Sequence, residues 1–287
     1  MKAYLPLLGL LLHLQALPAF AQTPSCDALD GEKKQQAEKI LSSQHPYDCC
    51  DDTIAACLRQ QPVCRLAWRL AESVCRQVAA GRGEREIVRA LSRRARSMMP
   101  GGRAARIALE GVPPLGQAGA PVVVVEYACA RCPFCAVITP RLVEAVRSGP
   151  LAGKVRLYYR LFPIRSHEYS KQAALAFAAA AELGRFWDYL LLAYRRFDSF
   201  CPLKQADWAA ELGLDKQEFS RLLQDRRLVE RVVRSKKEGI VNGVQATPTF
   251  FINGRKYLGE MDYREMVDVL EEEYDRLQGL KYREADK

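Results

Sequence analysis

The stretch "VVVVEYACARCPFC", residues 122–135, joins a run of β-branched residues to two overlapping Cys-x-x-Cys motifs. The continuous apolar run at its start predicts a strand that is buried on both faces. One motif spans Cys129 to Cys132 and the other spans Cys132 to Cys135. A Cys-x-x-Cys motif can form a redox pair, half of a zinc site or part of an iron–sulfur site. The residues around the three cysteines indicate which two sulfurs act together.

Local signals favour the second motif as a redox pair. A helix that begins near Cys132 would place this sulfur among unpaired backbone N–H groups, whose dipoles stabilise a thiolate. Pro133 suits the first helical position, where its missing N–H costs nothing. Cys135 follows one turn later, within reach of a reducible disulfide with Cys132. Cys129 lies in the strand-to-helix loop and gains none of these effects.

Cys129, the cysteine of the run that is not in the expected redox pair, could be bound in one of several ways. Cys-x-x-Cys-x-x-Cys overlaps the iron–sulfur run of bacterial ferredoxins, but that run needs a fourth cysteine three residues later. No cysteine follows Cys135 before Cys201. We therefore expect Cys129 to form a structural disulfide with Cys201 or to remain a free, buried thiol.

A second element of the site is expected far downstream, in "GVQATPTFFING" at residues 243–254. Thr247-Pro248 opens an apolar strand, where proline is tolerated and where a cis peptide bond would be a deliberate feature. Asn253-Gly254 then gives a strong hairpin signal.

The rest of this region predicts an α/β plan. Strands are expected at "RIALE" (residues 106–110) and at residues 154–162, followed by a long helical section at about 166–238. A closing helix is expected over residues 262–277. The order of strands and helices is typical of an α/β fold that carries a helical insertion.

The first residues predict export. Lys2, a short apolar run and Ala19-Phe20-Ala21 form the pattern of a secretory signal peptide that ends at Ala21. The run is interrupted and is shorter than the roughly 20 residues that cross a membrane. All ten cysteines follow this segment, and an oxidising compartment such as the periplasm would let them form disulfides.

Residues 22–99 predict a small, Cys-rich, all-helical region, and "PGGRAA" at residues 100–105 predicts its boundary. Cys50, Cys57 and Cys64 recur at seven-residue intervals, which return to one helix face. A helical hairpin that turns at residues 60–62 would place Cys57 opposite Cys64, with Cys49 or Cys50 near Cys75. We expect nested structural disulfides, with a zinc or copper site or a second redox pair as alternatives.

The chain carries a formal net charge of +9. Arginines are concentrated between residues 76 and 106, at Arg76, Arg82, Arg85, Arg89, Arg93, Arg94, Arg96, Arg103 and Arg106. No nucleic-acid recognition motif accompanies them, so no nucleic-acid partner is expected. We interpret these arginines as a solvated helix face.

"VVVVEYACARCPFC", "GVQATPTFFING" and "FPIRSHEYSKQAALAFAAAAELGRFWDYLLLAY" together resemble the DsbA-like branch of the thioredoxin superfamily. The resemblance covers about residues 104–280. It implies a thioredoxin-like domain over residues 104–287, with the linker and first strand at residues 100–120 and a helical insertion at about 166–238.

The resemblance also implies roles for individual residues. Cys132 matches the exposed nucleophile and Cys135 the buried resolving thiol. Glu126 matches a buried acid that relays a proton to or from Cys135. Pro248 matches the cis-proline whose flanking backbone pairs with an extended substrate peptide, and its loop neighbour Thr247, with Pro133 and Phe134, completes the expected substrate-binding surface.

The Cys-rich region resembles, over fewer positions, the thiol-reductase subunit CcmH of cytochrome c maturation. The matching positions are Cys50, "DDTIAAC", "VAAGRGEREIVRAL" and Arg94. Because the Cys-x-x-Cys motif of that subunit is absent here, the resemblance implies a helical-hairpin shape and no catalytic role.

These observations predict an exported thiol–disulfide oxidoreductase, which needs no cofactor or metal. Its expected partners are cysteine-containing substrate proteins and a membrane redox partner. Phe134 stands where the oxidase DsbA has a histidine between its cysteines, and Thr247 before the proline is more like family members that act as isomerases or reductases. Whether the protein is an oxidase, an isomerase or a reductase therefore stays open. The alternative is a thioredoxin-like metal-binding or chaperone module that does not turn over.

Overall fold

The computed structural model describes residues 23–99, 101 and 104–283. The expected signal peptide at residues 1–21 lies outside the described residues. The contacts divide the chain into two units, one comprising the residues up to Ala80 together with those from Tyr282 onward, and the other comprising Gly81–Lys281. None of the helices in the described part is long and apolar enough to span a membrane.

The first unit is helical and is cross-linked by disulfides. Its helices are α1 (Pro24–Asp27), α2 (Gly31–Leu41), α3 (Ile54–Cys57) and α4 (Arg65–Ala79). Disulfides join Cys26 to Cys75, Cys49 to Cys64 and Cys50 to Cys57. Helix α4 lies against α1, α2 and α3, and its apolar side is buried. Two of the disulfides thus tie α1 and the turn at Cys49 to α4 and its N-cap, and the third ties the turn at Cys50 to the end of α3.

The expected pairing of these cysteines was wrong, although all six form disulfides. Cys57 does not face Cys64, and Cys75 bonds neither Cys49 nor Cys50. The seven-residue spacing assumed continuous helix, but α3 has only four residues and turns flank it on both sides. The expected helical hairpin is therefore not formed, and the position of α1 against α4 gives Cys75 a partner in Cys26.

The second unit contains a five-stranded sheet in the order β1-β3-β2-β4-β5. Its strands are β1 (Pro114–Leu115), β2 (Val122–Ala128), β3 (Val155–Leu161), β4 (Thr249–Ile252) and β5 (Arg255–Lys256). Strands β2 and β3 are parallel, and the other neighbours are antiparallel. The buried run at residues 122–128 is therefore the central strand, as its β-branched composition predicts.

The strand expected at "RIALE" is not formed, and the first strand is β1. Residues 105–112 form neither strand nor helix, and the side chains of Ile107, Leu109 and Val112 pack on the core. Their apolar character therefore reflects burial without strand pairing.

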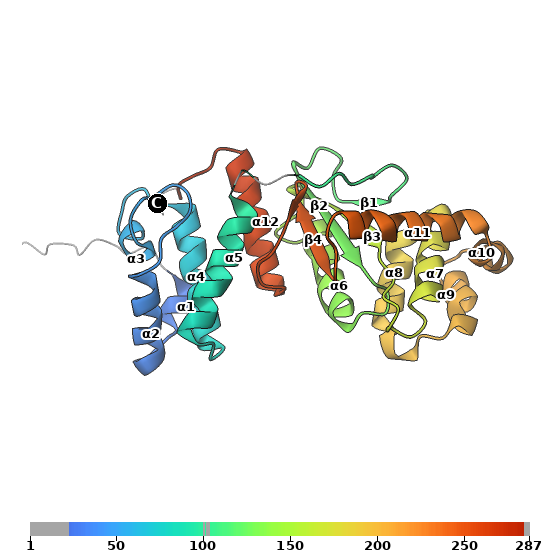
Figure 1. The fold of residues 1–287 in the computed structure, drawn as a ribbon, viewed down its shortest axis with the longest axis horizontal. Coiled ribbons are helices and arrows are strands. Elements are labelled where there is room, and N and C mark those ends of the chain that lie inside the picture. The colour runs from blue at the N-terminus through green and yellow to red at the C-terminus, as the bar shows by residue number, and fades with distance from the viewer. Residues whose placement is uncertain (1–22, 100, 102–103, 284–287) are drawn as a thin grey trace, which may run out of the picture. The chain divides into compact units, whose positions relative to one another are not determined.

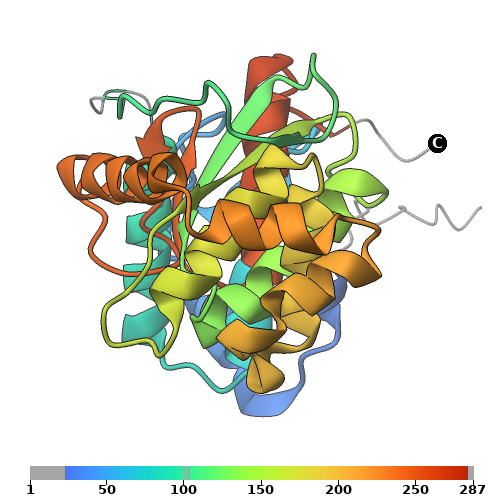
Figure 2. The ribbon, with the colours of Figure 1, turned by 90° about the vertical axis from the view of Figure 1, so that its right-hand side faces the viewer.

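Helices lie on both faces of this sheet (Figure 1). Helices α6 (Pro133–Arg147) and α12 (Tyr263–Leu277) pack against each other on one face. The insertion between β3 and β4 consists of α7 (Ser170–Glu182), α8 (Phe186–Arg195), α9 (Gln205–Glu211), α10 (Lys216–Leu223) and α11 (Arg226–Val241). Figure 2 shows these yellow and orange helices gathered at the front of the view. The helical insertion is thus formed where the sequence predicts it.

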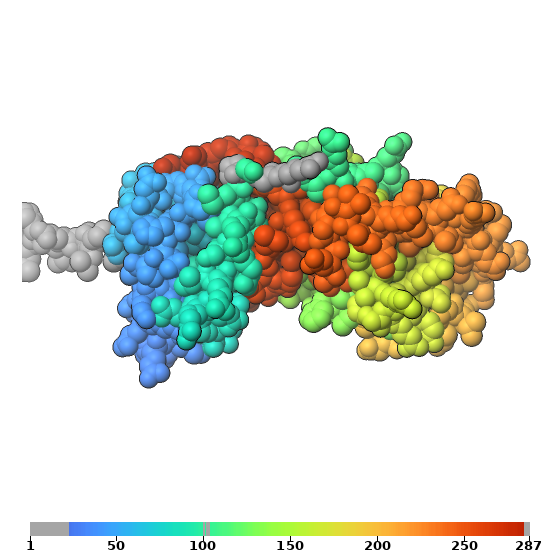
Figure 3. Space-filling view, in the orientation of Figure 1, coloured from blue at the N-terminus to red at the C-terminus, as the bar shows by residue number. Residues whose placement is uncertain are grey.

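Helix α11 approaches the other face closely at a glycine. A Cβ atom on Gly239 would lie 2.8 Å from the Phe162 ring and 2.9 Å from the Tyr127 ring. These two rings pack edge to face, with centroids 6.3 Å apart. The opposite side of α11 forms a continuous stretch of surface, in orange in Figure 3. Gly239 therefore lets α11 seal the core beside the end of β2.

Helix α5 (Glu84–Met98) belongs to this second unit. Its Arg94 is 1% exposed and forms ion pairs with Glu265 at 2.8 Å and Glu272 at 2.7 Å, both on α12. The interpretation of the arginines as a solvated face is therefore wrong at Arg94. The contacts place the start of the second unit at Gly81, before the boundary expected at residues 100–105.

Replacing Arg94 by Met should destabilise the second unit by about 3 kcal/mol, because buried carboxylates on α12 lose their cation. The matched control is Arg93→Met on the same helix, since the ion pair of Arg93 with Glu260 is partly exposed and should contribute less than about 1 kcal/mol. Urea unfolding of both variants measures the difference. Equal losses in the two variants would contradict the buried role of Arg94.

Candidate active site

Cys132 caps the N-terminus of α6, and Pro133 is the first residue of that helix. The chain leaves β2 and makes a turn in which the Cys132 N–H donates to the Cys129 carbonyl at 3.0 Å. The helix start expected at this cysteine is thereby confirmed. Its sulfur lies where the first N–H groups of the helix have no partner within the helix.

The second element of the site is the loop before β4. The Thr247-Pro248 peptide bond is cis, and the Cys132 sulfur lies 3.2 Å from the Thr247 carbonyl oxygen. Strand β4 then pairs with β2, with Thr249 opposite Tyr127. The structure thus brings together Cys132, Thr247 and Pro248, as the sequence predicts.

Cys132 is less exposed than the resemblance implies for a nucleophile. Cys132 is 2% exposed and Cys135 is fully buried, whereas Phe134 between them is 72% exposed. Cys132 is covered because the Thr247 carbonyl lies against its sulfur. A substrate would therefore meet the phenyl ring before it meets the thiol.

The two thiols have opposite electrostatic environments. A hydrogen bond from Cys135 lowers the pKa of Cys132 to about 5, helped by the Thr247 side chain and the backbone N–H groups of Phe134 and Cys135. Burial raises the pKa of Cys135 well above its usual value, and the hydrogen bond to Cys132 raises it further. At neutral pH the pair therefore holds one thiolate, located on Cys132.

Glu126 lies behind this pair. It is on β2, is fully buried, and accepts a hydrogen bond from the Thr139 hydroxyl at 2.6 Å. Burial raises the pKa of Glu126 to about 8, against the lowering effect of Thr139, and the charge of Cys132 adds to the rise. The charge of Glu126 also raises the pKa of Cys135. Glu126 is thus a buried acid that holds a proton near neutral pH.

Sequence reasoning missed three polar side chains around these groups. Thr139 follows Cys135 by four residues on α6, and this one-turn spacing could have identified it. Tyr159 lies opposite Glu126 on β3, and its hydroxyl lies 2.8 Å from that of Tyr194. Tyr194 is in the helical insertion, so no local signal in the sequence connects it with the site.

The expected disulfide between Cys129 and Cys201 is not formed, and both residues are free. In place of a disulfide, Arg131 connects this loop with the segment before Cys201, because its guanidinium lies 4.2 Å from the centre of the Phe197 ring. Cys129 is buried, and its sulfur lies 3.4 Å from Nδ1 of His167. The alternative expectation of a free, buried thiol is thus correct.

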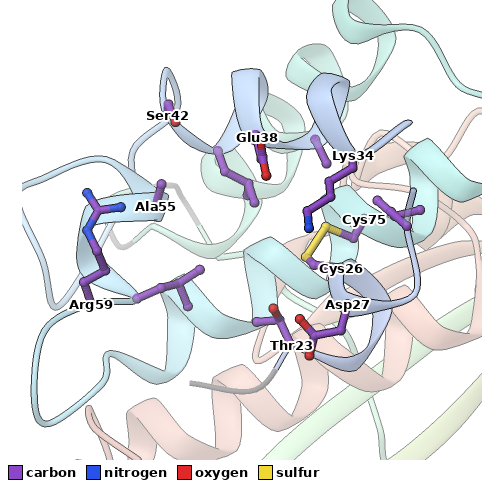
Figure 4. Close-up of a pocket in the computed structure, with 13 residues that line it drawn as sticks. Thr23, Cys26, Asp27, Lys34, Glu38, Ser42, Ala55, Arg59 and Cys75 are labelled. Carbon is purple, nitrogen blue, oxygen red and sulfur yellow. A yellow bond between two sulfur atoms is a disulfide. The ribbon is translucent and has the colours of Figure 1, made fainter. Parts of the chain in front are cut away.

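A cavity of about 580 Å³ lies in the first unit and is lined by none of the residues of the Cys132–Cys135 site. Figure 4 shows the Cys26–Cys75 disulfide on its wall, with Lys34, Glu38 and Arg59 around it. These charged side chains are exposed. Nowhere among residues 23–99, 101 and 104–283 do three or more His, Cys, Asp or Glu side chains form a group that could hold a metal ion.

Comparisons with known proteins bear on the family and the fold of this chain. A family model described as thioredoxin matches residues 110–272. The Na(+)/H(+) antiporter NhaA 3 of Salinispora tropica is 38% identical over 147 residues, which are 50% of this chain and 22% of the antiporter. The chain thus spans about a fifth of the length of that relative.

Two solved structures share the fold. BdbD from Bacillus subtilis, in its oxidised form, has a TM-score of 0.53 at 23% identity, covering 60% of this chain and 97% of BdbD. The thiol-disulfide exchange protein α-DsbA2 from Wolbachia pipientis has a TM-score of 0.50 at 22% identity, covering 58% of this chain and 87% of that protein. The thioredoxin-like fold expected from the sequence is confirmed.

The pKa of Cys132 can be measured through its reactivity. Alkylation of the reduced protein by iodoacetamide should show a midpoint near pH 5 at Cys132, because only the thiolate reacts. Cys135→Ala should raise this midpoint, since the largest stabilising hydrogen bond is lost, whereas Cys201→Ala should not change it. Peptide mass mapping over a pH series gives the midpoints. A midpoint near 8.5, the usual value of a free cysteine, would contradict the assignment.

Glu126 should make stability depend on pH. Its pKa is raised from 4.5 to about 8 in the folded protein, so stability should fall as pH rises through that range, by at most about 1.4 kcal/mol per pH unit. Glu126→Gln should remove this slope, whereas Glu144→Gln, an exposed control on α6, should retain it. Urea unfolding of the reduced proteins across this range measures it. Parallel pH curves for wild type and Glu126→Gln would refute the raised pKa.

Proposed function

Because the chain belongs to the thioredoxin family, we propose that it is an exported thiol–disulfide oxidoreductase that acts on cysteine-containing substrate proteins. The observation that carries this proposal is the pair at the start of α6. One sulfur has a low pKa and lies 3.2 Å from the Thr247 carbonyl, and the other is a buried, neutral thiol. This asymmetry is what a nucleophile and a resolving thiol require.

The exchange proceeds through two displacements at sulfur. A substrate thiolate attacks Cys132 in the Cys132–Cys135 disulfide, the disulfide bond breaks, and Cys135 leaves as a thiolate. Cys135 then takes up a proton, for which Glu126 is the nearby buried acid. A second substrate thiolate attacks the substrate sulfur of the mixed disulfide and releases Cys132. The substrate gains a disulfide and the protein becomes a dithiol.

We propose that the protein oxidises substrate dithiols, because the reaction in this direction releases Cys132 as a stable thiolate. A reduced form that is stabilised by a low thiol pKa makes its disulfide a stronger oxidant. Phe134 supplies no imidazole for this purpose. The Cys135 thiol, the Thr247 side chain and backbone N–H groups lower the pKa of Cys132 instead.

The surface around Cys132 favours an extended, partly apolar substrate. Phe134 and Val137 on the first turns of α6 are 72% and 64% exposed, and residues three apart on a helix are neighbours. The loop of Thr247 and Pro248 also contacts the sulfur, through the Thr247 carbonyl. We expect a substrate peptide to pair with the backbone of this loop and to place an apolar side chain on the α6 surface.

The proposed location is the periplasm. The signal peptide predicted at residues 1–21 would direct export, and the disulfides of the first unit suit an oxidising compartment. There, a membrane redox partner would return the Cys132–Cys135 dithiol to its disulfide.

Equilibration with glutathione buffers tests both the activity and its direction. The Cys132–Cys135 pair should show a reduction potential closer to about −120 mV, the value of DsbA, than to about −270 mV, the value of thioredoxin. Cys132→Ser should exchange no disulfide with a dithiol peptide, whereas Cys201→Ser should behave as wild type. A potential near that of thioredoxin would overturn the direction, and undiminished exchange by Cys132→Ser would overturn the function.

A further inference from the structure

The first of the two overlapping motifs, Cys129 to Cys132, forms a hydrogen-bonded turn. Cys129 and Cys132 are the first and fourth residues of a turn that is closed by the 3.0 Å hydrogen bond from the Cys132 N–H to the Cys129 carbonyl. Such a turn holds its end Cα atoms within about 7 Å. Disulfides bridge Cα atoms that are about 4.4–6.8 Å apart. The backbone therefore holds the Cα atoms of Cys129 and Cys132 at a separation that a disulfide could bridge.

The surroundings of the Cys129 sulfur suit a thiol that has to ionise during a reaction. His167 Nδ1 lies 3.4 Å from the sulfur. The backbone N–H groups of Ile164 and Arg131 also approach it, and they oppose the rise in the Cys129 pKa that burial causes. Burial thus favours the neutral thiol, and an imidazole nitrogen and two backbone N–H groups are arranged around it.

We propose that Cys129 is a second resolving thiol, which attacks mixed disulfides formed at Cys132. The proposal rests on the proposed function, because the mixed disulfide is an intermediate of that reaction. It adds a second way to resolve the mixed disulfide, which uses the Cys129-x-x-Cys132 motif and does not use Cys135.

The step balances without an additional oxidant. His167 Nδ1 accepts the proton of the Cys129 thiol, and the sulfur attacks Cys132. A Cys129–Cys132 disulfide forms as the bond between Cys132 and the substrate sulfur breaks. The substrate sulfur leaves as a thiolate and takes up the proton from His167. Cys129 is oxidised and the substrate sulfur is reduced, while Cys132 passes from one disulfide to another and Cys135 keeps its thiol.

Cys135→Ser isolates this route. The reduced variant is treated with one equivalent of Ellman's reagent at about pH 6, where Cys132 is the reactive thiolate. Release of the second thionitrobenzoate then reports resolution. We expect Cys135→Ser to release it, and peptide mapping to find a Cys129–Cys132 disulfide. The double variant Cys129→Ser/Cys135→Ser should keep the adduct roughly tenfold longer or more, because its neighbouring thiol is gone.

Cys201 gives the matched control, since it is the other free cysteine outside the redox pair. Cys135→Ser/Cys201→Ser should release the second thionitrobenzoate as fast as Cys135→Ser. An adduct of Cys135→Ser that lasts as long as that of the Cys129 double variant would overturn the proposal. Failure of Cys132 to form an adduct in any of these variants would overturn the proposed function as well.

His167 provides a variant that keeps all three sulfurs. His167→Gln in the Cys135→Ser background should slow the release and should shift its pH profile, because proton removal from Cys129 loses its base. An unchanged rate and pH profile would overturn the role of His167. This readout separates a chemical role from a structural one, since loss of packing alone would not move the pH profile.

Discussion

The site depends on the contact between the Cys132 sulfur and the Thr247 carbonyl, which joins positions 115 residues apart. The sheet makes this contact possible. Strand β2 ends where α6 begins, and β4 begins directly after Pro248. Because β2 and β4 are antiparallel neighbours, the end of one strand and the start of the other lie at the same edge. Any register shift between them would separate the thiol from the cis-proline loop.

The electrostatics of the site follow from crowding several acids into one buried volume. Burial raises the pKa values of Cys135 and Glu126, and Cys132 raises both further. The group with the most donors therefore takes the single negative charge, and this group is Cys132. The buried thiol and the buried acid remain protonated around it. The positions of these groups thus determine which one carries the negative charge and which ones hold a proton.

Local signals in the sequence predicted much of this arrangement. Pro133 after a cysteine, the β-branched run and Asn253-Gly254 each determine conformation within a few residues, and α6, β2 and the hairpin form accordingly. The disulfide partners of the first unit were not predictable in this way, because they depend on where α1 lies against α4. The Tyr159–Tyr194 contact likewise depends on how the insertion folds back over the sheet. Side-chain pairs across distant elements leave no periodic pattern in a single sequence.

The buried Arg94 also shows where the second unit can be divided from the rest of the chain. A gene fragment cut at Pro100 would keep α12 with its row of carboxylates but would discard the guanidinium that lies among Glu265 and Glu272. A fragment cut at Gly81 would keep both. For shuffling or fusion, the transplantable module therefore begins with α5, about twenty residues before the glycine-rich stretch that looks like a linker.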